Sequence, residues 1–142
     1  PVRAPVDLHA LTAEVAQAQG AAHRLQLPAQ PALIPGDAER LRLAISNLVA
    51  NALAHAPAGS PLEVSVQQSA DALEWSLRDH GPGVPDYALP RLGERFFSTG
   101  EGRGSGLGLA IVRQVAWLHG GTVRFESAQP GLRVVLALPP RA

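Results

Sequence analysis

The chain has 142 residues, 46% of them hydrophobic, which is enough for one domain with a single buried core. Its 12 basic residues are all arginine and balance 12 acidic residues, so the composition gives no overall positive charge for binding nucleic acid. The absence of cysteine excludes disulfide bonds and thiolate metal sites, and no apolar run approaches the roughly 18 residues of a membrane-spanning helix.

The N-terminal part of the chain is predicted to hold one helix and two short strands. Asp7 is a typical N-cap, and the apolar spacing after it predicts a helix over Leu8–Ala18, which Gly20 ends. Alternating apolar and polar residues then favour a strand over residues 23–27. A second short strand is predicted at residues 32–34.

The longest predicted helix begins after Asp37 and ends before Pro57. Its predicted buried stripe consists of Leu41, Ile45, Leu48 and Ala52. A second stripe is polar and recurs at i, i+4 and i+8: Asn47, Asn51 and His55. It lies about 90° from the first, at the edge of the buried face. Because asparagine is a poor helix former, the stripe is either a solvated surface or a set of neutral oxygen donors at a pocket, where amide oxygens can bind Mg²⁺ beside phosphates.

Two antiparallel hairpins are predicted from alternating apolar and polar residues, over residues 62–67 with 73–78 and residues 122–127 with 132–138. Helices and strands thus occur in mixed order. This order predicts an α+β fold, in which helices pack on one face of a mixed sheet.

Asp79 directly follows one of these strands and precedes Gly81 and Gly83. A carboxylate at a strand end is held on a rigid scaffold and suits a binding site. The same Asp-x-Gly pattern is also common in simple turns, so this stretch alone leaves both interpretations open. A short helix, broken by Pro90 and Gly93, is predicted beyond it, over residues 86–95.

A glycine-rich loop, residues 103–108, leads straight into an apolar helix whose predicted inward face is Leu107, Ile111, Val115 and Leu118. Glycines allow close backbone approach, and the helix N-terminus beyond offers free N–H groups, so the stretch predicts a phosphate cradle. The spacing does not match the dinucleotide fingerprint, and a chain without lysine cannot form a P-loop. A flexible surface loop stays possible from this stretch alone, and residues 98–103 are expected to form a flexible lid.

Four stretches occur in a fixed order: Asn47-x-x-x-Asn51-Ala-x-x-His55, Asp79-x-Gly81-x-Gly83, Phe96-Phe97 and Gly104-x-Gly106-Leu107-Gly108-Leu109. Together they resemble the N, G1, F and G2 boxes of the ATP-binding catalytic domain of bacterial sensor histidine kinases, within the GHKL superfamily that includes DNA gyrase. Each box alone is a weak signal, whereas four in order are specific. The resemblance implies a Bergerat fold, a two-layer α/β sandwich with a mixed, mostly antiparallel sheet.

The resemblance also implies roles for individual residues. Asn51 would be the Mg²⁺ ligand, and Asn47, Asn51 and Arg95 would be the catalytic residues. Asp79 would accept a hydrogen bond from the adenine amino group, which guanine lacks at that position. The residues implied around ATP are Asn47, Asn51, His55, Asp79, Gly81, Gly83, Val84, Phe96, Arg103, Gly104, Ser105, Gly106, Leu107, Gly108 and Leu109.

As a whole, the resemblance implies a domain that binds ATP and Mg²⁺ and donates the γ-phosphate to a histidine on an upstream dimerisation domain. None of the five histidines of this chain stands in the family's phosphoacceptor context. Residues 1–5 would be a linker, 6–139 the catalytic domain and 140–142 its end. The expected partners are that dimerisation domain and a response regulator, but no nucleic acid. The full protein would be a homodimeric inner-membrane sensor with this domain in the cytoplasm.

Three alternatives remain open from the sequence. A stand-alone GHKL-type ATPase usually carries glutamate at the position of Asn47, to activate water. A serine kinase of an anti-sigma system shares the same boxes. A degenerate nucleotide-binding module is the third, because Ala54 stands where family members often carry a basic residue.

Overall fold

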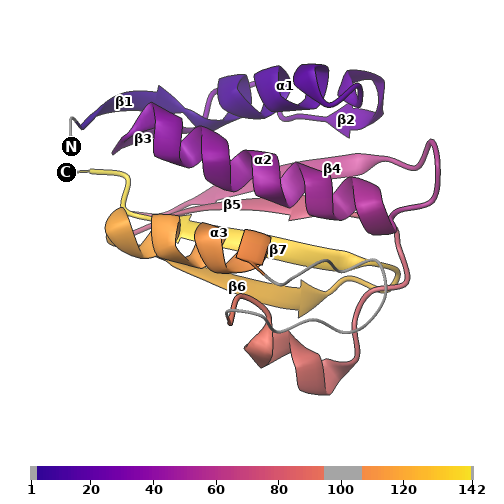
Figure 1. Cartoon of the computed structure of the whole chain (residues 1–142). Coiled ribbons are helices and arrows are strands. Elements are labelled where there is room, and N and C mark those ends of the chain that lie inside the picture. The colour runs from indigo at the N-terminus through magenta and orange to yellow at the C-terminus, as the bar shows by residue number, and fades with distance from the viewer. Residues whose placement is uncertain (1–2, 95–106, 142) are drawn as a thin grey trace.

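The computed structural model describes residues 3–94 and 107–141, in which helices pack on one face of a mixed sheet (Figure 1). The main sheet has the strand order β2-β4-β5-β7-β6. Its strands are β2 (Leu25–Gln26), β4 (Leu62–Gln68), β5 (Leu73–Arg78), β6 (Thr122–Ser127) and β7 (Leu132–Leu138). Only the β2–β4 pair within it is parallel. The predicted α+β class and both predicted hairpins are confirmed.

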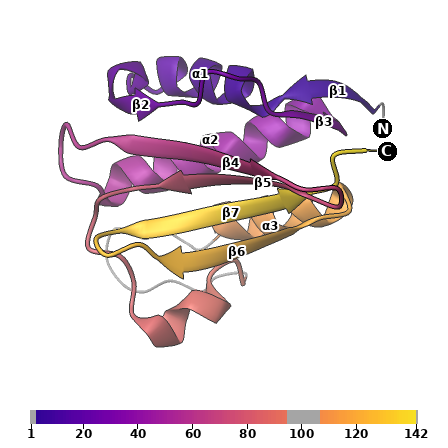
Figure 2. The same ribbon diagram turned by 180° about the vertical axis from the view of Figure 1, so that it is seen from behind.

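The helical layer consists of α1 (Leu8–Ala18), α2 (Ala38–His55) and α3 (Leu107–Leu118), with α2 packed between the other two. From behind, the strands lie in front of α2 and α3, so both helices cover the same face of the sheet (Figure 2). The predicted N-caps are confirmed, since the Asp7 carboxylate accepts from the His9 N–H and Asp37 accepts from two N–H groups of the first turn of α2. Among the described residues, no helix has the length and apolar character needed to cross a membrane.

A second, two-stranded sheet joins β1 (Ala4–Asp7) to β3 (Leu33–Gly36) in antiparallel register. It leads directly into α1 and α2, because β1 ends at the N-cap of the first and β3 ends just before the N-cap of the second. Ala4 and Pro5 are part of β1. The division between a linker and a domain at residue 5 stays a prediction.

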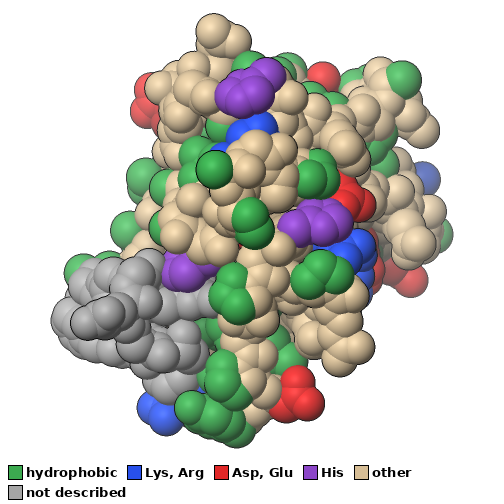
Figure 3. Space-filling model, turned by 90° about the vertical axis from the view of Figure 1, so that its right-hand side faces the viewer, with side chains coloured by type: hydrophobic (Ala, Val, Ile, Leu, Met, Phe, Trp, Pro, Cys, Tyr) green, Lys and Arg blue, Asp and Glu red, His purple; other side chains and the backbone are tan. Residues whose placement is uncertain are grey.

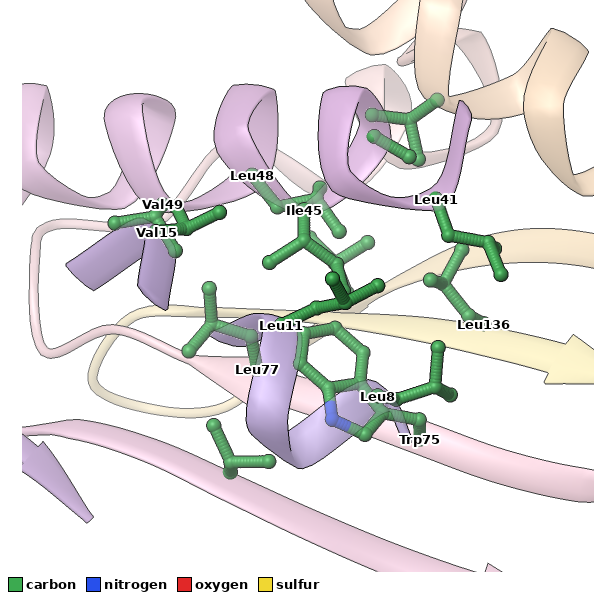
Figure 4. Close-up of a cluster of buried hydrophobic side chains, with 14 of the residues drawn as sticks. Leu8, Leu11, Val15, Leu41, Ile45, Leu48, Val49, Trp75, Leu77 and Leu136 are labelled. Atoms are coloured by element: carbon green, nitrogen blue, oxygen red, sulfur yellow. The ribbon is translucent and has the colours of Figure 1, made fainter. Parts of the chain in front are cut away.

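The core lies between the helices and the sheet (Figure 4). All four residues of the predicted apolar stripe of α2 are buried. They meet Leu8 and Leu11 from α1 and Trp75 from the centre of β5, whose side chain is fully buried. This packing fixes the rotation of α2 about its axis, so the polar stripe faces the edge of the layer.

Two predicted elements are shorter than expected. The strand predicted at residues 23–27 is reduced to β2, because Ala22–Arg24 form a 3₁₀ turn, η1. Arg24 anchors this turn by donating to the carbonyl oxygens of Ser60 at 2.8 Å and Pro57 at 3.0 Å. The helix predicted at residues 86–95 is a 3₁₀ turn, η2 (Asp86–Arg91), since Pro90 has no N–H to continue an α-helix.

The predicted inward face of α3 is only partly correct. Val115 is buried as expected, but Leu107, Ile111 and Leu118 are half-buried. The deepest residues are Leu109, Val112, Val115 and Ala116. The helix is apolar on more than one side, so periodicity alone did not select the face that meets α2.

His119, directly after α3, connects the end of that helix to the start of α2. The residue is 4% exposed, its Nδ1 donates to the Val115 carbonyl at 2.8 Å, and its Nε2 accepts from the Asp37 N–H at 3.1 Å. A carbonyl can only accept, so the tautomer is fixed by this pair of contacts. The imidazole thereby satisfies an N–H group at the N-terminus of α2.

We expect His119→Ala to lower the free energy of unfolding by about 2 kcal/mol, since it leaves a cavity and an unpaired N–H group. Urea denaturation followed by circular dichroism measures this change. The matched control is Trp117→Ala in the same helix, which removes a side chain that is 74% exposed. The control should change stability by less than about 0.5 kcal/mol. Equal losses in the two variants would contradict the assigned role of His119.

Candidate functional site

Three segments that are distant in the sequence lie along the C-terminal half of α2. The backbone of Gly81 touches this helix, since a Cβ at Gly81 would lie 2.5 Å from the His55 carbonyl oxygen. Gly108 in the first turn of α3 faces Asn47, and a Cβ there would lie 2.9 Å from the Asn47 Oδ1. The N-box stripe, the G1 loop and the start of the G2 helix are thus adjacent.

The polar stripe of α2 runs along the edge of the layer, as predicted, because Asn47, Asn51 and His55 are all half-buried. Asn47 Nδ2 donates to the Leu43 carbonyl at 2.9 Å, which leaves its oxygen on the side of α3. The Asn51 amide makes no hydrogen bond with the described residues. His55 Nδ1 donates to the Asn51 carbonyl at 2.7 Å, and its buried Nε2 has no partner in the described part of the chain.

Asp79 is buried at 4% exposure, one residue beyond β5. Its Oδ1 accepts from the Gly81 N–H at 2.8 Å and from the Leu132 N–H at 3.4 Å. Within the described ranges, no hydrogen bond involves its second oxygen, Oδ2. A buried carboxylate with one oxygen fixed and the other available can accept a hydrogen bond from a ligand.

Glycines bring the backbone close around this carboxylate. A Cβ at Gly131, whose φ is +100°, would lie 1.8 Å from the Asp79 carbonyl oxygen. Gly83 has a φ of +74°, and a Cβ there would lie 3.0 Å from the Gly131 carbonyl oxygen. Gly81 and Gly83 thus allow the loop backbone to approach neighbouring main-chain segments closely. Val84 follows them and packs half-buried against the core.

The N-terminus of α3 supplies the remaining described part of the predicted site. The helix begins at Leu107, next to Asn47, and Leu109 points into the core at 9% exposure. The partial positive charge of a helix N-terminus favours an anion there. The other predicted site residues lie outside the described residues: Arg95, Phe96, Arg103, Gly104, Ser105 and Gly106. The predicted lid at 98–103 also lies outside them.

The donor set fits Mg²⁺ held mainly by phosphate rather than by protein. No cluster of three or more His, Asp and Glu side chains able to hold a metal occurs among residues 3–94 and 107–141. Asn51 instead offers a single neutral amide oxygen with no partner there. Mg²⁺ commonly binds one or two protein oxygens together with substrate phosphates and water.

A cavity of about 1020 Å³ lies between α3 and β6, lined among others by Ile111, Trp117 and Val123. Neither Asp79 nor the polar stripe of α2 lines it. Among the described residues that line it, Leu107 is the only one that the sequence predicts around ATP. The polar groups and close glycine contacts at the end of α2 therefore define the candidate site.

Sequence reasoning missed two contributors to this site. Gly131 was predicted only as part of a turn, although its backbone crosses Asp79. Glu63 and His80 were not singled out, and they form a hydrogen-bonded pair beside the loop. A glycine in a hairpin turn and an isolated Asp-His-Gly sequence do not by themselves predict these contacts. Both contacts arise because β4 and β7 lie on either side of β5 in the sheet.

The family model described as histidine kinase-, DNA gyrase B- and HSP90-like ATPase matches residues 36–142. Among named relatives, the sensor protein QseC of Escherichia coli strain K12 is 41% identical over 112 residues, covering 78% of this chain and 22% of QseC. The sensor-type histidine kinase PrrB of Mycobacterium tuberculosis is 41% identical over 116 residues, covering 80% of this chain and 26% of PrrB. The chain therefore spans about a quarter of the length of these relatives.

Solved structures agree with this match over nearly the whole chain. The ATP-binding domain of PrrB from Mycobacterium tuberculosis superposes with a TM-score of 0.79 at 34% identity, covering 99% of this chain and 98% of that one. The mycobacterial sensor histidine kinase MprB gives a TM-score of 0.87 at 32% identity, covering 99% of both chains.

The contact between Gly108 and Asn47 is testable by Gly108→Ala. The added methyl group should displace the Asn47 amide and break its bond to Leu43, while the chain stays folded, because alanine gains up to about 1 kcal/mol of helix propensity over glycine. The Asn47 side-chain NH₂ signals in a ¹⁵N NMR spectrum should therefore shift. Ala110→Ser, in the same turn of α3, is the control. Unchanged Asn47 signals in Gly108→Ala would rule out the contact.

Proposed function

The chain belongs to the family of histidine kinase-, DNA gyrase B- and HSP90-like ATPases, and on this premise we propose that it is the ATP-binding catalytic domain of a sensor histidine kinase. It binds ATP with Mg²⁺ and donates the γ-phosphate to a histidine on a separate dimerisation domain. The observation that supports this proposal best is the buried Asp79 carboxylate, with one oxygen fixed and one available, inside a tight glycine-lined turn.

Adenine recognition follows from the geometry of Asp79. Its Oδ1 is occupied by two backbone N–H groups, which leaves Oδ2 as the oxygen that would accept a hydrogen bond from the ligand. The adenine amino group is a donor and matches it, whereas guanine presents a carbonyl oxygen at the corresponding position. Hydrogen bonds to charged groups contribute about 1.5–3 kcal/mol. ATP is therefore preferred over GTP by about tenfold or more.

The phosphate end of the site is built from neutral and partially positive groups. Asn51 would ligate Mg²⁺, which when bound neutralises phosphate charge, and Asn47 would contact the same region. The N-terminus of α3 would bring its partial positive charge near the phosphates. Arg95 and Arg103 would add positive charge. Phosphoryl transfer depends mainly on such positioning and charge stabilisation.

A kinase fits the residues better than a rapid ATPase does. Asn47 has an amide where water-activating relatives usually carry glutamate, and an amide cannot accept a proton as a general base. None of the five histidines stands in the phosphoacceptor context. The phosphate acceptor is then a histidine of a dimerisation domain in the same protein. The whole protein would pass the phosphate on to a response regulator and act as a homodimer at the inner membrane.

Calorimetric titration tests nucleotide binding directly. The chain should bind ATP in the presence of Mg²⁺, and Asn51→Ala should lower the affinity with Mg²⁺ present but hardly without it. Asp79→Asn should lower the affinity for ATP and raise the relative affinity for GTP, because the Asn oxygen would keep the two backbone bonds and its NH₂ group would face the base. Gln67→Ala, on the exposed part of β4, is the control. No binding of ATP at millimolar concentration by the folded chain would exclude a working nucleotide site.

The kinase proposal also predicts slow hydrolysis. Phosphate release from ATP should stay well below about one turnover per second, since no general base is available at Asn47. A coupled phosphate-release assay with Asn47→Glu as the comparison measures this. Rapid turnover by the unmodified chain would favour the stand-alone ATPase instead.

A further inference from the structure

The loop that carries Asp79 is bound to strands on both of its sides. On the β7 side, the Asp79 N–H donates to the Leu132 carbonyl at 3.0 Å. On the β4 side, His80 Nε2 is hydrogen-bonded to the Glu63 carboxylate. Asp79 and His80 are consecutive, so each of the two strands that flank β5 holds one residue of the turn.

The Glu63–His80 pair is sheltered but accessible to protons, with side chains that are 33% and 26% exposed. Figure 3 shows the side of the molecule toward which α2 ends, where histidine, basic and acidic side chains lie close together. Pairs of this exposure are partly screened by water. Their contribution is therefore modest, and it depends on whether the histidine carries a charge.

The charges facing the pair come from the neighbouring strands. Arg78 of β5 is the register partner of Glu63 and also of Arg133 in β7. The pKa of the Glu63 carboxyl is lowered, chiefly by the hydrogen bond from His80 and also by the charges of His80, Arg78 and Arg133. Arg78 donates to the Pro130 carbonyl at 3.0 Å, so its guanidinium is also engaged elsewhere. Glu63 thus stays an ionised acceptor around neutral pH.

The loop has little freedom to absorb the loss of this pair. Gly81 is wedged against the His55 carbonyl, and Gly131 is pressed on the Asp79 backbone. Any rotation of the His80 backbone therefore changes the direction of the Asp79 carboxylate, which has only one fixed oxygen.

We propose that His80, held by Glu63, is a positioning residue that aims the Asp79 carboxylate at the nucleotide base and makes base selectivity depend on pH. The inference rests on the proposed function, because it assumes that Asp79 meets adenine. Protonation of the imidazole places a positive charge against the Glu63 carboxylate and strengthens the pair. Selectivity for ATP over GTP should accordingly be higher when His80 is charged.

The test is calorimetric titration of ATP and of GTP, each with Mg²⁺, at about pH 6 and about pH 8, a range in which an ordinary histidine titrates. The readout is the ratio of the ATP affinity to the GTP affinity. Both ligands carry the same triphosphate, so protonation of the triphosphate affects both affinities equally and cancels in the ratio. In the unmodified chain this ratio should be about twofold to fivefold higher at the lower pH, the range expected for a partly exposed charge pair.

Two variants separate positioning from a general structural effect. His80→Gln keeps a side-chain N–H for Glu63 but cannot titrate, so its ratio should be intermediate and equal at both pH values. Glu63→Gln retains an acceptor without charge and should also remove the pH dependence. His23→Gln, at an exposed histidine of the η1 turn, should behave like the unmodified chain. Because these variants retain hydrogen-bonding groups, each is expected to fold.

The outcomes distinguish this inference from the proposed function. If His80→Gln binds ATP and its ratio of ATP to GTP affinity changes with pH as in the unmodified chain, the inference is overturned and the proposed function is unaffected. A ratio that does not change with pH in the unmodified chain would do so as well. Absence of ATP binding by the unmodified chain would overturn the proposed function, and the inference with it.

Discussion

The main chain around Asp79 can follow its path only because several segments approach one another with no side chain between them. Gly81 meets the last carbonyl of α2, Gly131 crosses the Asp79 carbonyl, and Gly83 meets Gly131 in turn. A Cβ at Gly81 or Gly131 would overlap backbone atoms, which cannot move aside as a side chain can, and a Cβ at Gly83 would make a tight contact with the Gly131 carbonyl oxygen. The backbone of the loop is therefore held against α2 and against the turn before β7 at once, and the rest of the site is built on that position.

The site separates its charged group from its neutral ones. Among the described residues, the one buried carboxylate lies in the G1 loop, whereas the groups near the start of α3 are amides and a helix N-terminus. Under the proposed function, a carboxylate in place of Asn51 would face a triphosphate at short range, where Coulomb repulsion inside a protein is strong. The Asn51 amide would instead give the metal an oxygen without that repulsion. A chain without lysine could in this way bind a highly charged ligand.

Much of this arrangement could be predicted from local sequence, and the exceptions have physical causes. The N-caps, the hairpins and the stripe of α2 follow from residues close together in the chain, and the structure contains them all. The inward face of α3 could not be selected, because apolar residues occupy more than one side and only packing against α2 decides. Gly131 and the Glu63–His80 pair were not foreseen because they depend on strand order, which brings β4 and β7 to either side of β5.

The two tryptophans occupy opposite environments: Trp75 is fully buried in the centre of the sheet, and Trp117 is 74% exposed on α3. An indole in an apolar interior emits at shorter wavelength and is shielded from dissolved quenchers, whereas an exposed one is not. The unlabelled protein therefore carries two separate optical reporters. One follows the integrity of the core, and the other follows whatever approaches the outer surface of α3.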